Sequence, residues 1–289
     1  MQLRLSSAEN RQKRILAVHD ISCIGRCALT VALPVLSAAG LETSILPTSI
    51  LSTHTGGFTG FTYRDLLSDF DPIMNHWKSL GLRFDGFFSG WLGTHLHIKK
   101  MHHLLDMFAE EHLRVVIDPV MGDNGRLYAT LDEAYVQEMR TYCARAQLLL
   151  PNMTEAALLT GTPYPDGDYT PAYVRDMLSR IIDMGAETVV LTGVSLEPGR
   201  IGAAALNRSG AMHYFDSEFI PGCWHGAGDV FASGLLAADM NGQPLEAALK
   251  TAVDFTSRCI IRTRNAGTDE RLGLQFEPEL VHLAAALLK

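Results

Sequence analysis

Short apolar runs alternate with longer amphipathic segments along most of the chain. The short runs predict β-strands at residues 15–18, 44–47, 84–89, 115–117, 148–150 and 188–191. Between several of these runs, apolar residues recur at the spacing of one helix face. This spacing predicts helices at residues 29–39, 64–80, about 98–110 and 174–184.

The alternation of strands and helices is typical of β-α-β units, in which helices cover a parallel sheet. Two later runs, 202–207 and 211–215, flank a turn-forming Arg-Ser-Gly segment and predict a hairpin. The last part of the chain is helical in pattern at 228–240, 245–263 and 278–288. Because no repeat or linker-like composition interrupts it, we expect one α/β domain over residues 14–289, preceded by a flexible lead at 1–13.

Composition and charge narrow the classes of function. The 289 residues include 24 Lys and Arg against 32 Asp and Glu, a net charge of −8. Nucleic acids and anionic membranes need clustered basic residues, so neither is an expected partner. No apolar run approaches the roughly 18 residues of a membrane-spanning helix, and residues 1–14 lack the apolar centre of a secretory signal. Five scattered cysteines suit a reducing cytoplasm, where we expect the protein to reside.

The most informative segment is Gly-Ala-Gly-Asp at residues 226–229, where a loop becomes a helix. Glycines let the backbone approach a ligand closely, and the first free N–H groups of a helix attract an anion. Asp229 at that point could take a proton from an attacking hydroxyl, as phosphoryl transfer to an alcohol requires. The alternative is a glycine-rich turn in which Asp229 merely favours the helix start.

Two more polar segments follow predicted strands. Asn152 and Glu155 come directly after 148–150 and could hold a hydrated Mg²⁺ at the carboxyl edge of the sheet. The same pair could instead cap a helix, and the two roles are compatible. Asp118 and Asp123 follow 115–117 and bring two carboxylates to that edge.

A fourth turn, Thr192 and Gly193 after 188–191, offers a hydroxyl and a flexible backbone to a nucleotide phosphate. Four polar turns at the ends of parallel strands would be a coincidence in a purely structural domain. The four together therefore favour a functional site over a structural role for each turn.

Together these motifs resemble the ribokinase superfamily. The Asp-Pro-Val-Met-Gly-Asp segment at 118–123 is similar to that of the vitamin kinases, which are pyridoxal/pyridoxamine kinases and hydroxymethylpyrimidine kinases. Ser-Thr-His-Thr-Gly at 52–56 resembles the Ser-Asn-His-Thr-Gly of pyridoxal kinases, and Gly-Trp-Leu-Gly at 90–93 resembles their Gly-Tyr-Leu-Gly. The resemblance extends from about residue 15 onward and implies a ribokinase-like three-layer αβα sandwich, with a mostly parallel central sheet and helices on both faces.

The resemblance also implies ATP-dependent phosphorylation of the 5′-hydroxymethyl group of pyridoxal, pyridoxamine or pyridoxine, in a homodimer that uses Mg²⁺ and for which a monovalent cation is a further candidate. In that case Asp229 is the general base. The implied roles of the other residues are an anion hole at Gly226, Ala227 and Gly228, a Mg²⁺ site at Asn152, Glu155 and Asp118, ATP contacts at Asp118, Thr154, Thr192, Gly193 and Val253, and a vitamin site at Asp20, Thr55 and Trp91. Mg²⁺ and helix-terminal amides would then bind ATP despite the net charge of −8.

The sequence departs from the pyridoxal kinase pattern in its vitamin site. Asp20 stands where many pyridoxal kinases carry a small hydroxyl residue, and it could pair with a ring N–H or an exocyclic amine. Trp91 replaces a tyrosine and can still stack on a flat ring. Gly57 stands where tyrosine is common. These departures leave open the preferred vitamer and a hydroxymethylpyrimidine kinase as the alternative. A non-catalytic vitamin- or nucleotide-binding regulator is the rival of a different class, against which Asp229 argues.

Other features are better explained without a ligand. Histidines cluster at 95, 97, 102 and 103, which we interpret as a solvated helix face in preference to a metal site. Aromatic residues at 58, 61, 63 and 70 are expected in the core or at a subunit contact. Cys23 and Cys27 are expected to be small buried residues, and Cys223 a small loop residue whose role is undetermined.

Overall fold

The computed structural model describes residues 11–110, 112–165 and 169–288. The strands are β1 (Arg14–Ser22), β2 (Glu42–Leu51), β3 (Tyr63–Asp65), β4 (Gly86–Ser89), β5 (Arg114–Ile117), β6 (Gly122–Asp123), β7 (Arg126–Leu127), β8 (Leu148–Leu149), β9 (Thr188–Val194), β10 (Arg200–Asn207) and β11 (Met212–Glu218). The α-helices are α1 (Leu29–Ala38), α2 (Leu67–Ser79), α3 (His95–Met107), α4 (Glu133–Cys143), α5 (Met153–Thr160), α6 (Pro171–Asp183), α7 (Ala227–Met240), α8 (Leu245–Ala266) and α9 (Leu280–Leu287). Two 3-10 helices, η2 (Glu270–Leu272) and η3 (Glu277–Glu279), lie between α8 and α9.

A nine-stranded sheet runs through the molecule in the order β11-β10-β9-β8-β5-β4-β1-β2-β3. The six strands from β9 to β2 are parallel to their neighbours. The antiparallel strands lie at the two edges, with β10 and β11 forming the predicted hairpin on one side and β3 on the other. The carboxyl ends of the parallel strands therefore meet along one edge of the sheet.

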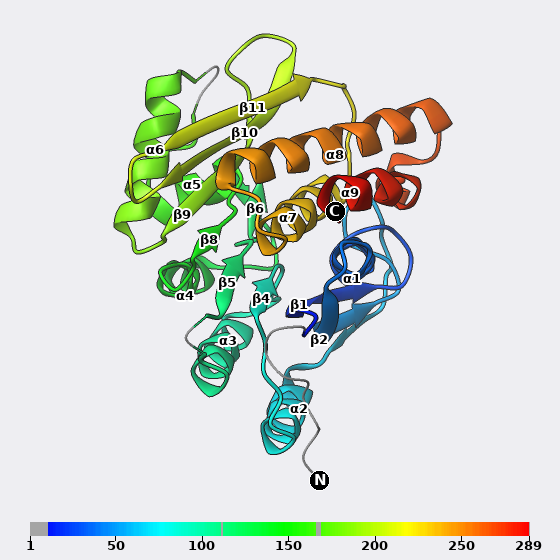
Figure 1. Ribbon diagram of the computed structural model, residues 1–289, viewed down its shortest axis with the longest axis vertical. Helices are drawn as coiled ribbons and strands as arrows, with labels where there is room; N and C mark the ends of the chain where they lie inside the picture. The colour runs from blue at the N-terminus through cyan, green and yellow to red at the C-terminus, as the bar shows by residue number, and fades with distance from the viewer. Residues whose placement is uncertain (1–10, 111, 166–168, 289) are drawn as a thin grey trace.

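Helices cover both faces of this sheet because successive strand residues point to opposite sides. Leu16, Phe87 and Ile117 pack with α2 to α6 in one core. The neighbouring residues Ile15 and Phe88 pack with α1, α7, α8 and α9 in the other. Figure 1 shows these two helical layers on either side of the sheet. The predicted three-layer αβα sandwich is confirmed.

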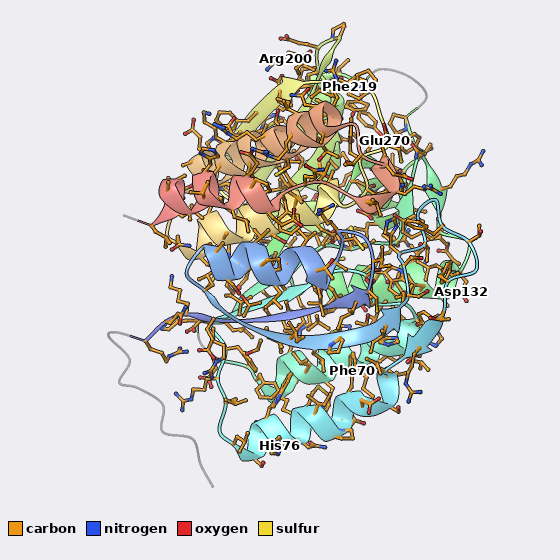
Figure 2. All side chains as sticks on the ribbon, turned by 90° about the vertical axis from the view of Figure 1, so that its right-hand side faces the viewer. Phe70, His76, Asp132, Arg200, Phe219 and Glu270 are labelled. Carbon is orange, nitrogen blue, oxygen red and sulfur yellow. The ribbon has the colours of Figure 1, made fainter. Side chains whose placement is uncertain are left out.

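The helix expected over 64–80 begins later than its pattern suggested. Tyr63–Asp65 instead forms β3, which pairs antiparallel with the end of β2. The Asp65 carboxylate accepts the Leu67 N–H at 2.7 Å, so the helix begins only after this turn. Of the four aromatic residues expected in the core, only Phe70 is fully buried, between α2 and the sheet (Figure 2). Phe61 and Tyr63 are 37% and 45% exposed, so neither belongs to the core, and a subunit contact at these two residues stays a prediction.

Two short strands and one helix were not predicted from the periodicity of the sequence. Strands β6 and β7 contain two residues each and form a small hairpin after β5, too short to show an alternating pattern. Helix α4 buries Tyr135 and Tyr142, whose hydroxyl groups weaken its apolar pattern. Its first turn is capped by Asp132, which accepts the Tyr135 N–H at 2.9 Å.

The end of the expected flexible lead is anchored to the fold. Residues 1–10 of that lead lie outside the described residues. Arg11 pairs with Asp85 at 2.5 Å, and Lys13 donates to the Met240 carbonyl at 2.5 Å, so residues 11–13 are held before β1 begins. In the described parts of the chain, no helix is both long and apolar enough to cross a bilayer.

Candidate active site

The polar residues predicted at the strand ends lie in a row along the carboxyl edge of the sheet. Asp118 donates its N–H to the Ser89 carbonyl at 2.8 Å, which ties the end of β5 to the end of β4. A parallel bridge joins Asn152, after β8, to Thr192 in β9. Asp20 lies near the end of β1 and is 8% exposed. The parallel register therefore brings together residues that are far apart in sequence.

The start of α7 depends on Gly226. This residue has φ of 76°, and a Cβ there would lie 2.1 Å from the Arg26 carbonyl oxygen. Only glycine allows the α7 loop and the loop after β1 to approach so closely. The Ala227 N–H donates to the Trp224 carbonyl at 3.1 Å. Of the predicted anion-hole amides, that of Ala227 is therefore engaged, whereas Gly228 in the first turn of α7 has no backbone acceptor among the described residues.

Four carboxyl groups occupy this edge without a basic partner in the described chain, where no ion pair reaches Asp20, Asp118, Glu155 or Asp229. Burial, followed by the charge of Asp229, raises the pKa of Asp20 to about 7. Burial raises the pKa of Asp229 to about 6. Burial, then the charges of Glu155 and Asp229, holds the pKa of Asp118 well above its ordinary value. Such crowded carboxyl groups are typical of functional sites.

Asn152 and Glu155 form a helix cap, the structural role that their positions also predict. Glu155 N–H donates to Asn152 Oδ1 at 2.9 Å, and Asn152 N–H donates to Glu155 Oε2 at 2.8 Å. Asn152 Nδ2 also donates to the Gly122 carbonyl, and Met121 N–H donates to Glu155 Oε1 at 3.2 Å. The side-chain amide of Asn152 thus positions the β6 segment, and its predicted contact with Mg²⁺ stays a prediction. Burial raises the pKa of Glu155 to about 8.

The donor set at this edge fits a hydrated divalent cation. Asp118 is 9% exposed, and no described residue donates a hydrogen bond to its carboxylate. In the described residues, no three His, Cys, Asp or Glu side chains are close enough to enclose a bare ion. Mg²⁺ keeps several waters and uses one or two carboxylates with substrate phosphates. Asp118 and the remaining lone pairs of Glu155 are suited to that role.

The residues predicted for ATP lie on one side of this row. Thr154 Oγ1 accepts the Gly125 N–H at 2.9 Å and so holds the β6–β7 turn. Thr192 donates its N–H to the Pro151 carbonyl at 2.9 Å. Gly193 has φ of 70° and open space around it. Val253, by contrast, is buried in α8 within the helical core, and its contact with adenine stays a prediction.

The residues predicted for the vitamin lie on the other side. Trp91 is half-buried after β4, and its ring meets that of Tyr63 edge-on. Thr55 is exposed on the loop after β2. The preceding His54 donates from Nε2 to the Arg271 carbonyl at 2.5 Å, because its Nδ1 accepts the Gly56 N–H at 3.1 Å. His54 therefore ties the Thr55 loop to η2.

Tyr128 is a candidate site residue that belongs to none of the predicted motifs. It lies after the β6–β7 hairpin, and the charges of Glu155, Asp123, Asp118 and Asp229, after burial, raise the pKa of its hydroxyl. Tyr128 therefore lies near enough to the carboxyl cluster for their charges to interact, and it is 39% exposed. The sequence signal was its place just beyond the Asp-Pro-Val-Met-Gly-Asp motif.

The structure places one histidine and two cysteines differently from their predicted positions. His97 is fully buried, and its Nδ1 lies 2.9 Å from Thr94 Oγ1, so it does not belong to a solvated helix face. Cys23 is exposed and Cys27 only half-buried, so the expected burial of both is wrong. Cys223 is an exposed loop residue, as expected, and its Sγ lies 3.5 Å from His225 Nε2.

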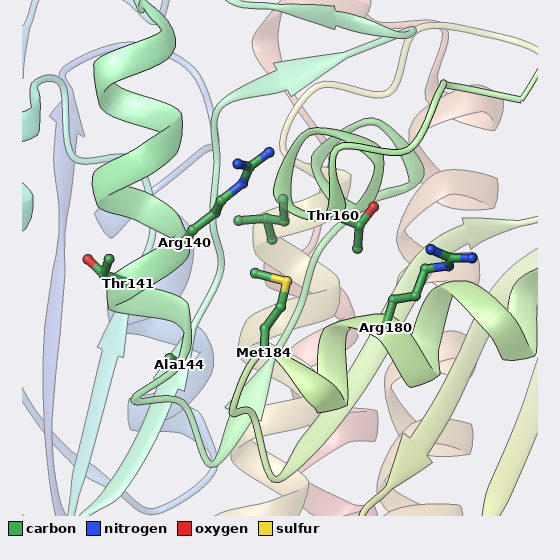
Figure 3. Close-up of a pocket in the computed structure, with 7 residues that line it drawn as sticks. Arg140, Thr141, Ala144, Thr160, Arg180 and Met184 are labelled. Atoms are coloured by element: carbon green, nitrogen blue, oxygen red, sulfur yellow. The ribbon is translucent and has the colours of Figure 1, made fainter.

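A surface hollow of about 560 Å³ lies away from these residues, between α4, α5 and α6 (Figure 3). Thr160, at the end of α5, lines it together with Arg140 and Arg180. Asn152 and Glu155 are at the opposite end of the same helix. The hollow is therefore separate from the carboxyl edge of the sheet, and the candidate active site rests on the carboxyl cluster.

Asp118→Asn is expected to stabilise the protein while impairing its Mg²⁺ response. Removing one carboxylate relieves repulsion among Asp118, Glu155 and Asp229, so the melting temperature should rise by about 2 °C or more without metal. It also removes a proposed cation ligand, so added Mg²⁺ should stabilise the variant less than the wild type. Thermal unfolding with and without Mg²⁺ checks both effects. Asp106→Asn, an exposed control on α3, should show neither, and an unstabilised Asp118→Asn would contradict the repulsion argument.

The free protein is expected to lose stability as pH rises from about 6.5 to 8.5. Asp20 and Glu155 have pKa values of about 7 and 8 in the folded protein, against about 4 in an unfolded chain. The folded state therefore binds more protons in this interval, and unfolding becomes easier as they are lost. Buried His19, with its pKa lowered to about 3, acts in the opposite direction only below about pH 6.5. Calorimetric unfolding at both pH values tests the sign, and a constant or rising stability would contradict it.

Comparison with known proteins points to one family. The model of the phosphomethylpyrimidine kinase family matches residues 82–272. A pyridoxine/pyridoxal/pyridoxamine kinase of Bordetella avium (strain 197N) is 27% identical over 280 residues, which cover 91% of this chain and 90% of the relative.

Solved structures agree with this family over almost the whole chain. A Bacteroides thetaiotaomicron protein crystallised with pyridoxal superposes with a TM-score of 0.90 and is 34% identical, with 94% of this chain and 96% of that chain covered. The pyridoxal kinase from Lactobacillus plantarum superposes with a TM-score of 0.87 and is 33% identical, with 94% of this chain and 97% of that chain covered.

Proposed function

Because the chain belongs to the phosphomethylpyrimidine kinase family, and its similar structures include a pyridoxal kinase, we propose that it transfers the γ-phosphoryl group of ATP to the 5′-hydroxymethyl group of a B6 vitamer. Pyridoxal, pyridoxamine and pyridoxine are the candidate acceptors, and the products are the 5′-phosphate and ADP. The observation that carries the proposal is the position of Asp229 in the first turn of α7, beside the carboxyl groups at the sheet edge.

Asp229 acts as the general base in this proposal. Its carboxylate accepts the proton of the 5′-hydroxyl as that oxygen attacks the γ-phosphorus, and the bond to the ADP oxygen breaks. With its pKa raised to about 6, Asp229 is a stronger base than an ordinary carboxylate and is still ionised at neutral pH. The Gly226 and Gly228 amides and the positive end of α7 stabilise charge on the transferring group, and Ala227 joins them if its bond to Trp224 opens.

ATP binds along the other strand ends. Thr154, Thr192 and Gly193 contact its phosphates, and Val253 belongs to the helical wall beside adenine. Asp118 and Glu155 hold Mg²⁺, with Asn152 keeping the loop between them in place. When bound, this cation neutralises phosphate charge and orients the γ-phosphoryl group. A monovalent cation at the same edge is a further candidate.

The acceptor ring lies between Asp20, Thr55 and Trp91. Trp91 supplies a flat surface for the ring. Asp20 is almost buried, and its one side-chain hydrogen-bond partner among the described residues is Ser22, at 3.3 Å. Its carboxylate is thus available to a ring N–H or an exocyclic amine. We further propose that the enzyme resides in the cytoplasm, because all five cysteines are free. We also propose that it is a single domain and forms a homodimer, the assembly that the family resemblance implies.

A hydroxymethylpyrimidine is the second candidate acceptor. The family model and the acidic Asp20 favour it, since an aminopyrimidine offers the N–H donors that a carboxylate binds. The acceptor carries the same hydroxymethyl group, so Asp229 and the α7 amides would serve it unchanged. The difference between the two candidates is therefore confined to the ring site.

Product identification tests the proposed reaction. The purified protein is incubated with MgATP and pyridoxal, and the products are separated by chromatography, identified by mass spectrometry and quantified. We expect pyridoxal 5′-phosphate and ADP in equal amounts, because each transfer yields one of each. ADP without a phosphorylated vitamer would show that water is the acceptor and would contradict the proposal.

A further inference from the structure

Tyr63 presents an exposed aromatic ring beside Trp91. It lies in β3 and is 45% exposed, although its neighbour Phe70 is fully buried. The ring centroids of Tyr63 and Trp91 are 6.3 Å apart with an angle of 82° between the rings. This edge-to-face geometry is a favourable aromatic contact. The two rings therefore form an aromatic corner, defined by Tyr63 and Trp91, with part of Tyr63 open to solvent.

Gly93 lies directly beside this contact. A Cβ at Gly93 would lie 3.3 Å from the Tyr63 hydroxyl oxygen and 3.4 Å from the Trp91 ring. Gly93 also has φ of 71°, a conformation that favours glycine. The turn after β4 is therefore shaped so that both rings pack over its backbone.

The Tyr63 side chain is held from behind by Asp65. Its hydroxyl donates to Asp65 Oδ2 at 3.2 Å, while Asp65 Oδ1 accepts the Leu67 N–H that begins α2. His97 Nε2 lies 3.7 Å from Asp65 Oδ1. Three elements, β3, α2 and α3, thus converge on the carboxylate that orients Tyr63. A ring oriented before a ligand binds loses little conformational freedom on binding.

His97 connects this support to the Trp91 loop. Its Nε2 lies 3.3 Å from the Thr48 carbonyl, which can only accept, so Nε2 carries the proton. Nδ1 then accepts the Thr94 hydroxyl at 2.9 Å. Burial is the main cause that lowers the pKa of His97, which keeps the ring neutral. Thr94 ends the turn that begins at Trp91, and Thr48 lies in β2 just before the residues that pair with β3, so the neutral imidazole links the segment that carries Trp91 to the strand beside Tyr63.

The aromatic corner lies two strands from the strand that holds Asp20, because Tyr63 pairs with Leu51 of β2 and Leu51 pairs with Ser22 of β1. Burial and Asp65 raise the pKa of the Tyr63 hydroxyl to about 12, and the charge of Asp20 adds to this shift. Tyr63 is therefore near enough to Asp20 for their charges to interact.

We propose that Tyr63 is a specificity-determining residue whose ring, together with Trp91, contacts the flat heteroaromatic ring of the acceptor. This inference rests on the proposed function and adds a residue to its acceptor site. Asp65 and His97 act through Tyr63 and Trp91 as positioning residues. The aromatic corner selects planar acceptors because an edge-to-face pair of rings offers contact area to a flat molecule on two sides.

Steady-state kinetics of Tyr63→Ala test this proposal, with Phe61→Ala as a matched control from the same loop. Phe61 is 37% exposed and belongs to the same aromatic run. We expect Tyr63→Ala to raise KM for pyridoxine about tenfold, with kcat and the KM for ATP within about twofold of wild type. Tyr63→Phe keeps the ring but loses the hydrogen bond to Asp65, so its KM for pyridoxine should lie between that of the wild type and that of Tyr63→Ala. Phe61→Ala should behave as wild type.

Several outcomes would overturn the inference. Equal effects of Tyr63→Ala and Phe61→Ala, or a shift of both variants to a smaller species in sedimentation, would make this loop a subunit contact. Parallel increases in both KM values would indicate a general loss of structure. A wild-type enzyme that phosphorylates pyridoxine while Tyr63→Ala is unchanged would refute the inference alone. A wild-type enzyme without turnover of any vitamer would instead refute the proposed function, and this inference with it.

Discussion

Asp229→Asn is expected to lower kcat by about 10² to 10⁴ while leaving ATP affinity within about twofold of wild type. Asparagine keeps the size of the side chain and its place in the first turn of α7, but it cannot accept the proton of the attacking hydroxyl. The variant also removes the charge that helps raise the pKa of Asp20 and Asp118. Its loss of activity should therefore arise from the chemical step and not from unfolding. Turnover measurements and calorimetric titration with ATP separate the two quantities.

The pH dependence of the wild type provides a second readout of the same residue. With a pKa of about 6, Asp229 must be deprotonated to act, so kcat/KM should rise with pH up to about that value. Asp254→Asn, an exposed change on α8 that removes an ion pair with Lys250, is the matched control and should retain full activity. An Asp229→Asn enzyme with near wild-type kcat would remove Asp229 from the role of base.

Gly226→Ala is expected to disrupt both the fold around α7 and the activity. A Cβ would lie 2.1 Å from the Arg26 carbonyl oxygen, and a non-glycine residue at φ of 76° costs about 1–2 kcal/mol before any clash. The start of α7 must move away from the loop after β1, which carries Asp229 away from the acceptor. Misplacement by about 1 Å is enough to lower kcat/KM about a hundredfold. Thermal unfolding and kinetics of the variant measure the two effects.

Gly228→Ala separates backbone geometry from anion binding. Gly228 lies in the first turn of α7, and a Cβ there meets no atom within 4 Å. Its melting temperature should therefore equal or exceed that of wild type, since alanine favours a helix more than glycine does. Its KM for ATP should rise if a phosphate approaches this backbone. A Gly226→Ala variant as stable as Gly228→Ala would contradict the close-approach argument.

The layers of the fold were predictable because each parallel strand is an apolar run and each covering helix has one apolar face. The errors occurred where local hydrogen bonds override periodicity. Asp65 binds the Leu67 N–H and so delays the start of α2, which leaves Tyr63 in an edge strand. Strands β6 and β7 are too short for any period to be read from their residues.

The candidate site was partly predictable because its motifs follow strand ends, and parallel strands bring their ends together. What the sequence could not reveal were contacts between loops. Tyr128 and Tyr63 carry no motif of their own, and only the folded chain places them beside carboxyl groups. His97 likewise read as a surface residue from its neighbours at 95, 102 and 103, whereas its ring is enclosed between α3 and the sheet edge.

At the glycine-rich start of α7, the same residues can have a structural role and a functional role. Gly226 is required by the approach of Arg26, which is a structural reason, and the same turn leaves the Gly228 amide free. Asn152 and Glu155 likewise form a complete capping box, while the charge of Glu155 helps to raise the pKa of Asp118. In both places the residue types that shape the backbone are also those to which the proposed function assigns the chemistry.

The most direct test of the account is a comparison of kcat/KM for pyridoxal, pyridoxamine, pyridoxine and hydroxymethylpyrimidine, measured by coupled detection of ADP release. The proposed function predicts efficient turnover of at least one B6 vitamer, with a higher kcat/KM than for the pyrimidine, and its loss in Asp229→Asn. Turnover of hydroxymethylpyrimidine alone would assign the acceptor site to the pyrimidine and contradict the proposal.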